Sequence, residues 1–251
     1  MTETHVLVER PQAQPGVMVI RFNRPEKKNA ITSDMYDRMT AALHEADNDA
    51  AVRAVAFLGT EGCFSAGNDM ADFLAYAMSG GGRPAAADFL RALATCGKPM
   101  VSGVDGLAIG IGTTLNLHCD MTIASDRSLF RTPFVDLALV PEAASSLLAP
   151  RVMGHQRAFA LLVAAEGFTA EQARDAGIVW KIVSAQAVEA ETLALAASLA
   201  VKPPHALKIA RDLLRGNGDD VLARMDEELV HFAAQLRSAE ARAAFEAFMR
   251  R

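Results

Sequence analysis

The chain has 251 residues, and its 25 Lys and Arg against 30 Asp and Glu give a formal charge of −5. A chain of this length can bury a full hydrophobic core without disulfides or a structural metal. Hydrophobic residues make up 51% of it, which excludes extended disorder. The acidic balance argues against a general nucleic-acid or membrane-surface binder, because both need a basic face.

The sequence carries no pattern that predicts secretion or a membrane anchor. Its first twenty residues hold acidic residues and two prolines instead of a basic start and an apolar run. No window approaches the roughly 18 uncharged apolar residues of a membrane span. Cys63, Cys96 and Cys119 are odd in number and far apart, which argues against a disulfide framework. We therefore expect a cytoplasmic protein with no membrane partner.

In the first 140 or so residues, apolar runs alternate with helical patterns. Along the chain we predict a strand at 17–22, a helix at 33–48, a strand at 53–58, a helix at 85–94, a strand at 99–104, a buried helix at 110–118, and strands at 121–124 and 128–131. Helix 33–48 has its apolar residues on one face and Thr32 or Ser33 as its cap. This alternation indicates an α/β core.

After about residue 143 the pattern is almost entirely helical. A capping box at 169–172 begins one helix, and Pro203-Pro204 begins another. We expect a core over residues 1–195 and a helical C-terminal region over 196–251. The glycine-rich stretch 79–82 is either a loop beside a site or a surface linker.

Scans for common catalytic motifs give little. The six histidines are scattered, and the sequence has neither an HExxH motif nor a CxxC pair, so we expect no metal. His118-Cys119-Asp120 is better explained as a buried helix end than as a nucleophile cluster, since adjacent helical residues face different ways. The run 106–115 lacks the third glycine of a dinucleotide motif. It predicts a strand, a tight turn and a helix start, whose free amides suit an anion.

Four segments in order give a stronger indication. They are Asn23-Arg-Pro-Glu-Lys-Lys-Asn-Ala30, Phe64-Ser-Ala-Gly-Asn-Asp69, Val104-Asp-Gly-Leu-Ala-Ile-Gly-Ile-Gly112 and Val140-Pro-Glu-Ala-Ala-Ser-Ser146. In sequence and spacing they resemble the crotonase, or enoyl-CoA hydratase/isomerase, superfamily. The similarity continues through 168–183 and 202–214 and so covers nearly the whole chain.

The resemblance implies a fold, an assembly and a substrate class. The fold is a crotonase-type ββα spiral core with a helical C-terminal region that assembles trimers or pairs of trimers. The substrate is an acyl-CoA thioester, so coenzyme A arrives with the substrate and no separate cofactor is expected. Carried over by position, the backbone amides of Ala66 and Ile111 form an oxyanion hole for the thioester oxygen. Ile111 replaces the glycine usual in the family.

The resemblance also bears on which reaction is catalysed. Hydratases of the family hold water between two glutamates, whose places are occupied here by Thr114 and Phe134. Neither side chain moves a proton at neutral pH. Glu142 stands where the Δ3,Δ2-enoyl-CoA isomerases of the family carry their catalytic glutamate. We therefore expect an enoyl-CoA isomerase with Glu142 as its single acid and base. The alternative role for Glu142 is to cap a helix. The alternative functions are a hydratase or other crotonase-type reaction, and a non-catalytic acyl-CoA-binding protein.

The remaining candidate residues surround these motifs. The expected coenzyme A and substrate contacts are Arg24, Lys27, Asn29, Ala30, Gly67, Asn68, Asp69, Gly110 and Phe134. For Asp69 the residues favour a role in bracing its loop over a substrate contact. Phe134 would help to exclude water. The apolar positions 70, 73, 74 and 78 line either an acyl pocket or a helical core stripe.

Overall fold

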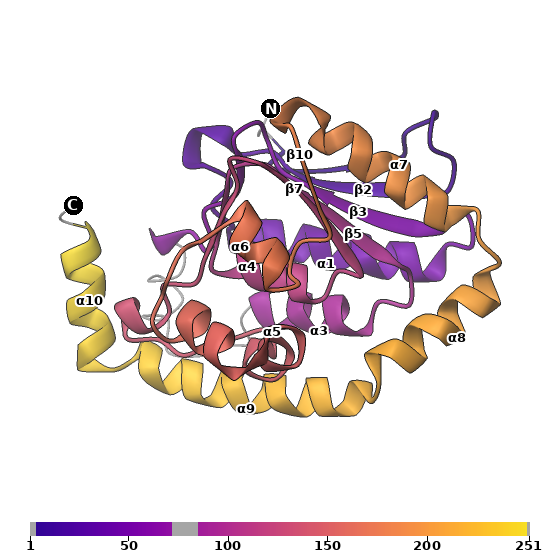
Figure 1. Cartoon of the computed structure of the whole chain (residues 1–251). Coiled ribbons are helices and arrows are strands. Elements are labelled where there is room, and N and C mark those ends of the chain that lie inside the picture. Colours follow the sequence, from indigo (N-terminus) through magenta and orange to yellow (C-terminus); the bar gives the residue numbers. More distant parts are fainter. Residues whose placement is uncertain (1–3, 72–84, 250–251) are drawn as a thin grey trace.

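The computed structural model describes residues 4–71 and 85–249, and it builds them from two β-sheets and a set of helices (Figure 1). The first sheet has the strand order β1-β2-β3-β5-β7-β10, in which only β1 and β2 are antiparallel. Its strands are β1 (Val6–Glu9), β2 (Val17–Phe22), β3 (Ala54–Leu58), β5 (Met100–Val104), β7 (Met121–Ser125) and β10 (Lys181–Val183). The second sheet, ordered β4-β6-β8-β9, consists of β4 (Cys63–Ser65), β6 (Leu107–Ile109), β8 (Leu129–Arg131) and β9 (Phe168–Thr169).

The first sheet is covered on both faces, as its continuous apolar strands require. Met18 of β2 packs with Met35 of α1 (Ser33–Asn48) in the larger core cluster, which also takes in α3 (Ala85–Thr95). Its neighbour Val19 faces the other way and packs with Ala196 of α7 (Val188–Ala200). The pleat explains this alternation, because successive side chains of a strand point to opposite faces.

Three inner strands of the first sheet are each followed by a short strand of the second. β3 leads to β4, β5 to β6 and β7 to β8, and helices or 3₁₀ turns complete the repeats. After β6 come α4 (Ile111–Thr114) and a 3₁₀ turn at Leu115–Leu117, so the helix expected at 110–118 is an α turn followed by a tighter one. The second sheet brings the ends of β4 and β6 side by side, where they support the site described below.

Several local predictions are confirmed. Helix α1 has the predicted bounds, and the Thr32 side chain accepts a hydrogen bond from Met35 N. The capping box at Thr169 is formed by both of its hydrogen bonds. Helix α8 begins at Pro204. The sequence patterns missed β1, β4, β6, β9 and β10, and all but β1 lie in stretches that are only two or three residues long. The glycine-rich stretch 79–82 lies outside the described residues.

The C-terminal helices lie on both sides of the first sheet. They are α5 (Ser145–Leu162), α6 (Ala170–Asp175), α7, α8 (Pro204–Arg215), α9 (Gly218–Leu236) and α10 (Ala239–Met249). Helix α9 packs against α3 and α5, and Figure 1 shows α8 and α9 following one another along the lower edge. The expected boundary at residue 195 falls inside α7, which packs on the first sheet, and the division stays a prediction.

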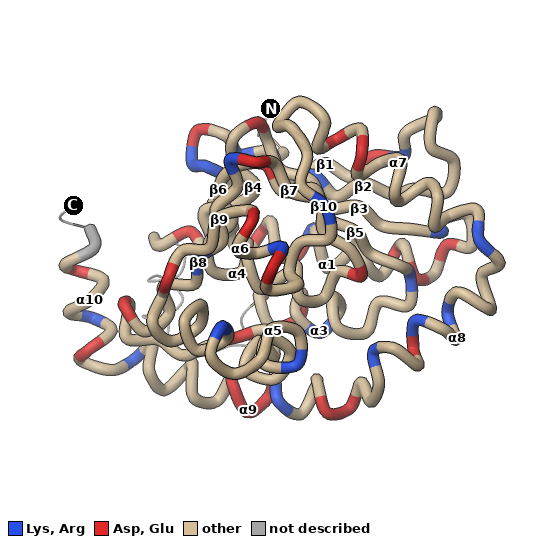
Figure 2. The backbone as a smooth tube through the Cα atoms, viewed as in Figure 1, with Lys and Arg blue, Asp and Glu red and all other residues tan. Residues whose placement is uncertain are grey.

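Basic residues predominate on α8 and acidic residues on α9, so the two helices do not form one continuous basic stretch (Figure 2). Among the described helices, none is both long and apolar enough to cross a membrane. The expected cytoplasmic location stays a prediction.

Candidate active site

A cavity of about 70 Å³ lies between the residues that follow β4, the segment that precedes α5, and α9. Apolar side chains of α3 and α9 form much of its wall, among them Leu90 and Phe232. Three residues singled out by the sequence also line it, namely Asn68, Asp69 and Glu142. The fold therefore joins two motifs that lie more than seventy positions apart in the chain.

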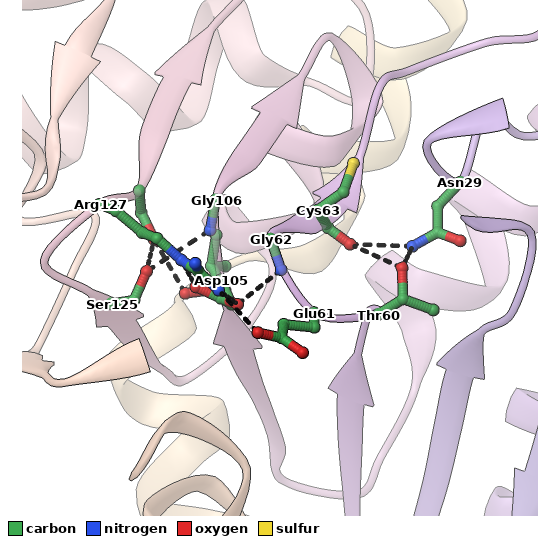
Figure 3. A network of polar contacts seen from close by, with 11 residues as sticks. Asn29, Thr60, Glu61, Gly62, Cys63, Asp105, Gly106, Ser125 and Arg127 are labelled. Atoms are coloured by element: carbon green, nitrogen blue, oxygen red, sulfur yellow. Dashed lines mark hydrogen bonds and ion pairs between the residues drawn. The ribbon is translucent and has the colours of Figure 1, made fainter. Parts of the chain in front are cut away.

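Asn29 fixes the turn of residues 24–30 to strand β4. Its side chain is fully buried, and its Nδ2 donates to the carbonyl oxygens of Cys63 at 2.8 Å and Phe64 at 3.2 Å and to Thr60 Oγ1 at 2.9 Å (Figure 3). Its Oδ1 accepts from Arg24 N at 2.8 Å. These bonds engage both hydrogens of Nδ2, one of them shared between two acceptors, and one lone pair of Oδ1. Asn29 is therefore buried with both of its side-chain polar atoms bonded within the protein, and it supports the site from within.

Asp105 fixes the neighbouring corner between β5 and β6. Its carboxylate accepts from Gly62 N at 2.7 Å and from Arg127 Nη2 at 2.6 Å, as Figure 3 shows. Gly106 has φ +72°, and a Cβ built on it would lie 1.9 Å from Gly62 O. Only glycine permits that approach. The loop before β4 and the corner before β6 are therefore held against each other.

The amide of Ala66, which the family resemblance placed in the oxyanion hole, is already engaged. Ala66 N donates to Lys28 O at 2.9 Å, and the next amide, Gly67 N, donates to Ser65 Oγ at 3.1 Å. A donor held by a backbone carbonyl is not free for a substrate oxygen, so the expectation for Ala66 is wrong in this structure. Among the described residues, Asn68 N has no acceptor, and Asn68 also lines the cavity.

The second expected amide, that of Ile111, is available. Ile111 is the first residue of α4, and Gly110 O accepts from Thr113 N and Thr114 N instead. Its own amide belongs to the first helical turn and has no acceptor in the described part of the chain. Gly110 has φ 56° and ψ −120°, a combination open to glycine. A Cβ on Gly110 would lie 4.0 Å from Gly67 Cα, so the turns before Asn68 and Ile111 are adjacent.

Glu142 lines the cavity and is hydrogen-bonded to the helix that begins at Ile111. Its side chain accepts a hydrogen bond from Thr114 Oγ1 at 2.6 Å, and Thr114 is the last residue of α4. The residue is 7% exposed. Burial raises the pKa of Glu142 to about 8, the Thr114 bond opposes the rise, and the charge of Glu228 adds to it. A carboxyl with such a pKa holds a proton near neutral pH and can also release it.

The other residues predicted to contact coenzyme A or the substrate lie in different environments. Arg24 Nη1 pairs with Asp69 Oδ2 at 2.7 Å and also donates to Ala30 O at 2.9 Å. This pair braces the loop after β4, as the bracing alternative for Asp69 proposed. Lys27 is exposed and stays a predicted contact for coenzyme A. Phe134 is buried in the core and is not among the residues that line the cavity.

The triple His118-Cys119-Asp120 is structural. Burial lowers the pKa of His118 to about 4, so the ring is neutral at pH 7, and its Nε2 lies 2.7 Å from Ala143 O. Burial also raises the pKa of Cys119 to about 12. Asp120 accepts from Arg211 Nε at 2.8 Å. Over residues 4–71 and 85–249, no three His, Cys, Asp or Glu side chains gather as a metal site.

Two residues at this site escaped sequence reasoning. Tyr36 of α1 donates from its hydroxyl to Asn68 Oδ1 at 2.6 Å and lines the cavity. Nothing in the sequence pointed to it, because it also fits the apolar face of its helix. Glu228 of α9 binds the segment that follows Glu142. Its signal was a carboxylate on the stripe formed by Met225, Leu229, Phe232 and Leu236.

Comparison with known proteins gives consistent matches. A family model described as enoyl-CoA hydratase/isomerase matches residues 12–251. Enoyl-CoA delta isomerase 2 of Rattus norvegicus is 36% identical over 223 residues, which are 86% of this chain and 56% of that protein, so the chain spans about half of that relative's length. The 1,2-epoxyphenylacetyl-CoA isomerase of Escherichia coli K12 is 29% identical and covers 94% of this chain and 93% of its own. A crystal structure of an enoyl-CoA hydratase/isomerase from Pseudoalteromonas atlantica T6c superposes with a TM-score of 0.92 at 38% identity, covering 98% of this chain and 97% of that one.

Proposed function

This chain belongs to the enoyl-CoA hydratase/isomerase family, and from that premise we propose that it converts a 3-enoyl-CoA into the conjugated 2-enoyl-CoA. The observation that carries the proposal is Glu142, the buried acid among the described residues that line the cavity, with a pKa raised to about 8. The relative from Rattus norvegicus bears the name of an enoyl-CoA isomerase, which supports the same choice.

In the proposed reaction, the Glu142 carboxylate removes a proton from C2 of the substrate. The electrons of the C2–H bond form a dienolate whose negative charge rests on the thioester oxygen. The same carboxyl then returns the proton at C4, which leaves a double bond between C2 and C3. No atom is gained or lost, so one group that first accepts and then donates a proton is sufficient. The raised pKa of Glu142 suits both steps.

The dienolate oxygen needs fixed hydrogen-bond donors, and we assign them to the amides of Asn68 and Ile111. Both lack an acceptor within the described residues, and both follow glycines whose turns are adjacent. One such donor typically lowers a barrier by about 3–4 kcal/mol. The Tyr36 hydroxyl holds the Asn68 side chain and thereby helps to fix this turn.

Hydration is the weaker alternative, because it needs a second group to activate water. The two places of the hydratase glutamates hold Thr114 and Phe134, and Thr114 is used as a donor to Glu142. Asp69 is the other acid of the cavity wall, and its carboxylate is paired with Arg24. A carboxylate held in an ion pair is a poor base, because the cation favours its ionised form.

Product analysis tests the proposal. The purified protein receives a 3-enoyl-CoA in one reaction and a 2-enoyl-CoA in another. We expect the first to yield the 2-enoyl-CoA and neither to yield 3-hydroxyacyl-CoA. Rapid formation of 3-hydroxyacyl-CoA would contradict the proposal and indicate a hydratase. Binding of both thioesters without turnover would indicate an acyl-CoA-binding protein.

A further inference from the structure

The segment between Glu142 and α5 is held in an unfavourable backbone conformation. Ala143 has φ 60° and Ala144 has φ 51°, so two consecutive alanines occupy the left-handed region. This region is disfavoured for alanine, because its Cβ approaches the following carbonyl oxygen. A strained segment keeps its shape only where its surroundings hold it. The orientation of Glu142 therefore depends on the groups that bind this segment.

Glu228 binds the segment from α9, more than eighty residues further along the chain. Its Oε2 accepts from Ala144 N at 2.6 Å, and its Oε1 accepts from Ser146 N at 2.9 Å and from Ser146 Oγ at 2.5 Å. Ala144 is the N-cap residue of α5 and has no side-chain oxygen to bind the free amides of the first turn. The Glu228 carboxylate supplies that acceptor, and its charge suits a helix N-terminus.

Two further contacts complete the support of Glu142. His118 Nε2 lies 2.7 Å from Ala143 O, and it donates this bond because a carbonyl oxygen can only accept. Thr114 Oγ1 binds the Glu142 side chain itself. Glu228 is the acid among these supports, and it is not among the residues that line the cavity. It can act on the reaction only through the segment it binds and through its charge.

We propose that Glu228 is a positioning residue, which holds segment 142–146 and thereby fixes the reacting carboxyl of Glu142 at the cavity. The inference rests on the assignment of Glu142 as the acid and base. It makes helix α9 a part of the catalytic apparatus, in addition to a wall of the cavity.

The charge of Glu228 gives this role a measurable signature. It raises the pKa of Glu142. The other charged or titratable groups near Glu142 are paired with an opposite charge or are neutral. Asp69 is paired with Arg24, and His118 is neutral. On α9, Arg224 lies 3.2 Å from Ser146 Oγ and pairs with Glu227 at 3.0 Å. Removal of the Glu228 charge should therefore lower the pKa of Glu142.

The test compares Glu228→Gln, Glu228→Asp and the control Glu227→Gln, which removes an exposed carboxylate from the same helix. In Glu228→Gln, the amide NH₂ faces a backbone N–H and the charge is lost. We expect kcat to fall about 10–100-fold, with KM changed less than about threefold, and the acid limb of the kcat profile to move to lower pH. Glu228→Asp keeps the charge but shortens the reach, so kcat should fall while the limb stays in place. The control should match the wild type.

Two NMR measurements test the inference without relying on turnover. The carboxyl carbon of Glu142, identified by its loss in Glu142→Gln, should titrate at lower pH in Glu228→Gln. The Ala144 and Ser146 amides should lose hydrogen-exchange protection in both Glu228 variants. If Glu228→Gln does not fold, Glu228→Asp carries the exchange test. Unchanged protection, titration and kcat in a folded Glu228→Gln would overturn the inference. A wild-type protein that fails to isomerise a 3-enoyl-CoA would instead contradict the proposed function.

Discussion

At the scale of single residues, the site depends on one carboxyl whose environment favours its neutral form. Glu142 is buried and accepts one hydrogen bond from Thr114, and the charge of Glu228 raises its pKa further. We expect Glu142→Gln to lower turnover at least ~100-fold, since it removes the only proposed acid and base while keeping the shape. Activity assays and calorimetric binding of a saturated acyl-CoA check this. Loss of activity with intact binding is the expected result, and activity within about threefold of the wild type would contradict the assignment.

The same carboxyl should make stability depend on pH. Because the pKa of Glu142 is about 8 in the folded protein against 4.5 for an ordinary glutamate, the folded protein binds the extra proton between these two values. Folding stability contributed by Glu142 is therefore present below pH 4.5 and is lost as the pH rises toward 8. We expect Glu142→Gln to melt at a higher temperature than the wild type, with a difference that grows from pH 5 to pH 8. Comparing the two proteins cancels the titration of His118, and a constant difference would contradict the raised pKa.

At the scale of elements, the turn of residues 24–30 and strand β4 form one unit through Asn29. Asn29→Ala would leave Thr60 Oγ1 and the carbonyls of Cys63 and Phe64 without their donor. It would also place an alanine at φ 53°. We expect a loss of about 2–4 kcal/mol in the free energy of unfolding. Urea denaturation measures it, with the exposed Asn48→Ala as control. A loss below ~1 kcal/mol would show that the turn is held by other contacts.

At the scale of the whole molecule, α8 presents an apolar face that the described chain does not cover. Ile209, Leu213 and Leu214 are exposed on it, Leu214 by 90%. A cluster of this kind on one helix is typical of an interaction surface. We propose that it meets another copy of the chain in a trimer or a pair of trimers. Light scattering should show that Leu213→Glu lowers the molar mass while Val135→Glu does not. A monomeric wild type would contradict the proposal.

Much of the molecule followed from local patterns in the sequence. The bounds of α1, the capping box at Thr169 and the start of α8 were predicted, because caps and apolar spacing act within a few residues. Four motifs in order identified the family and its fold, and both are confirmed. The short strands β4 and β6 were missed, because three residues are too few to show a period.

The sequence by itself determined the family, the α/β core, the helical C-terminal region and Glu142 as the leading acid. Only the tertiary structure decided which groups act on that acid. Ala66 N donates to Lys28 O, whereas Asn68 N has no acceptor among the described residues, because hydrogen bonds between distant segments set which donors are used. Glu228 reaches Ala144 and Ser146 from α9, and Thr114 reaches Glu142 from α4. Such contacts depend on where the fold places remote elements, and no pattern within one short segment carries that information.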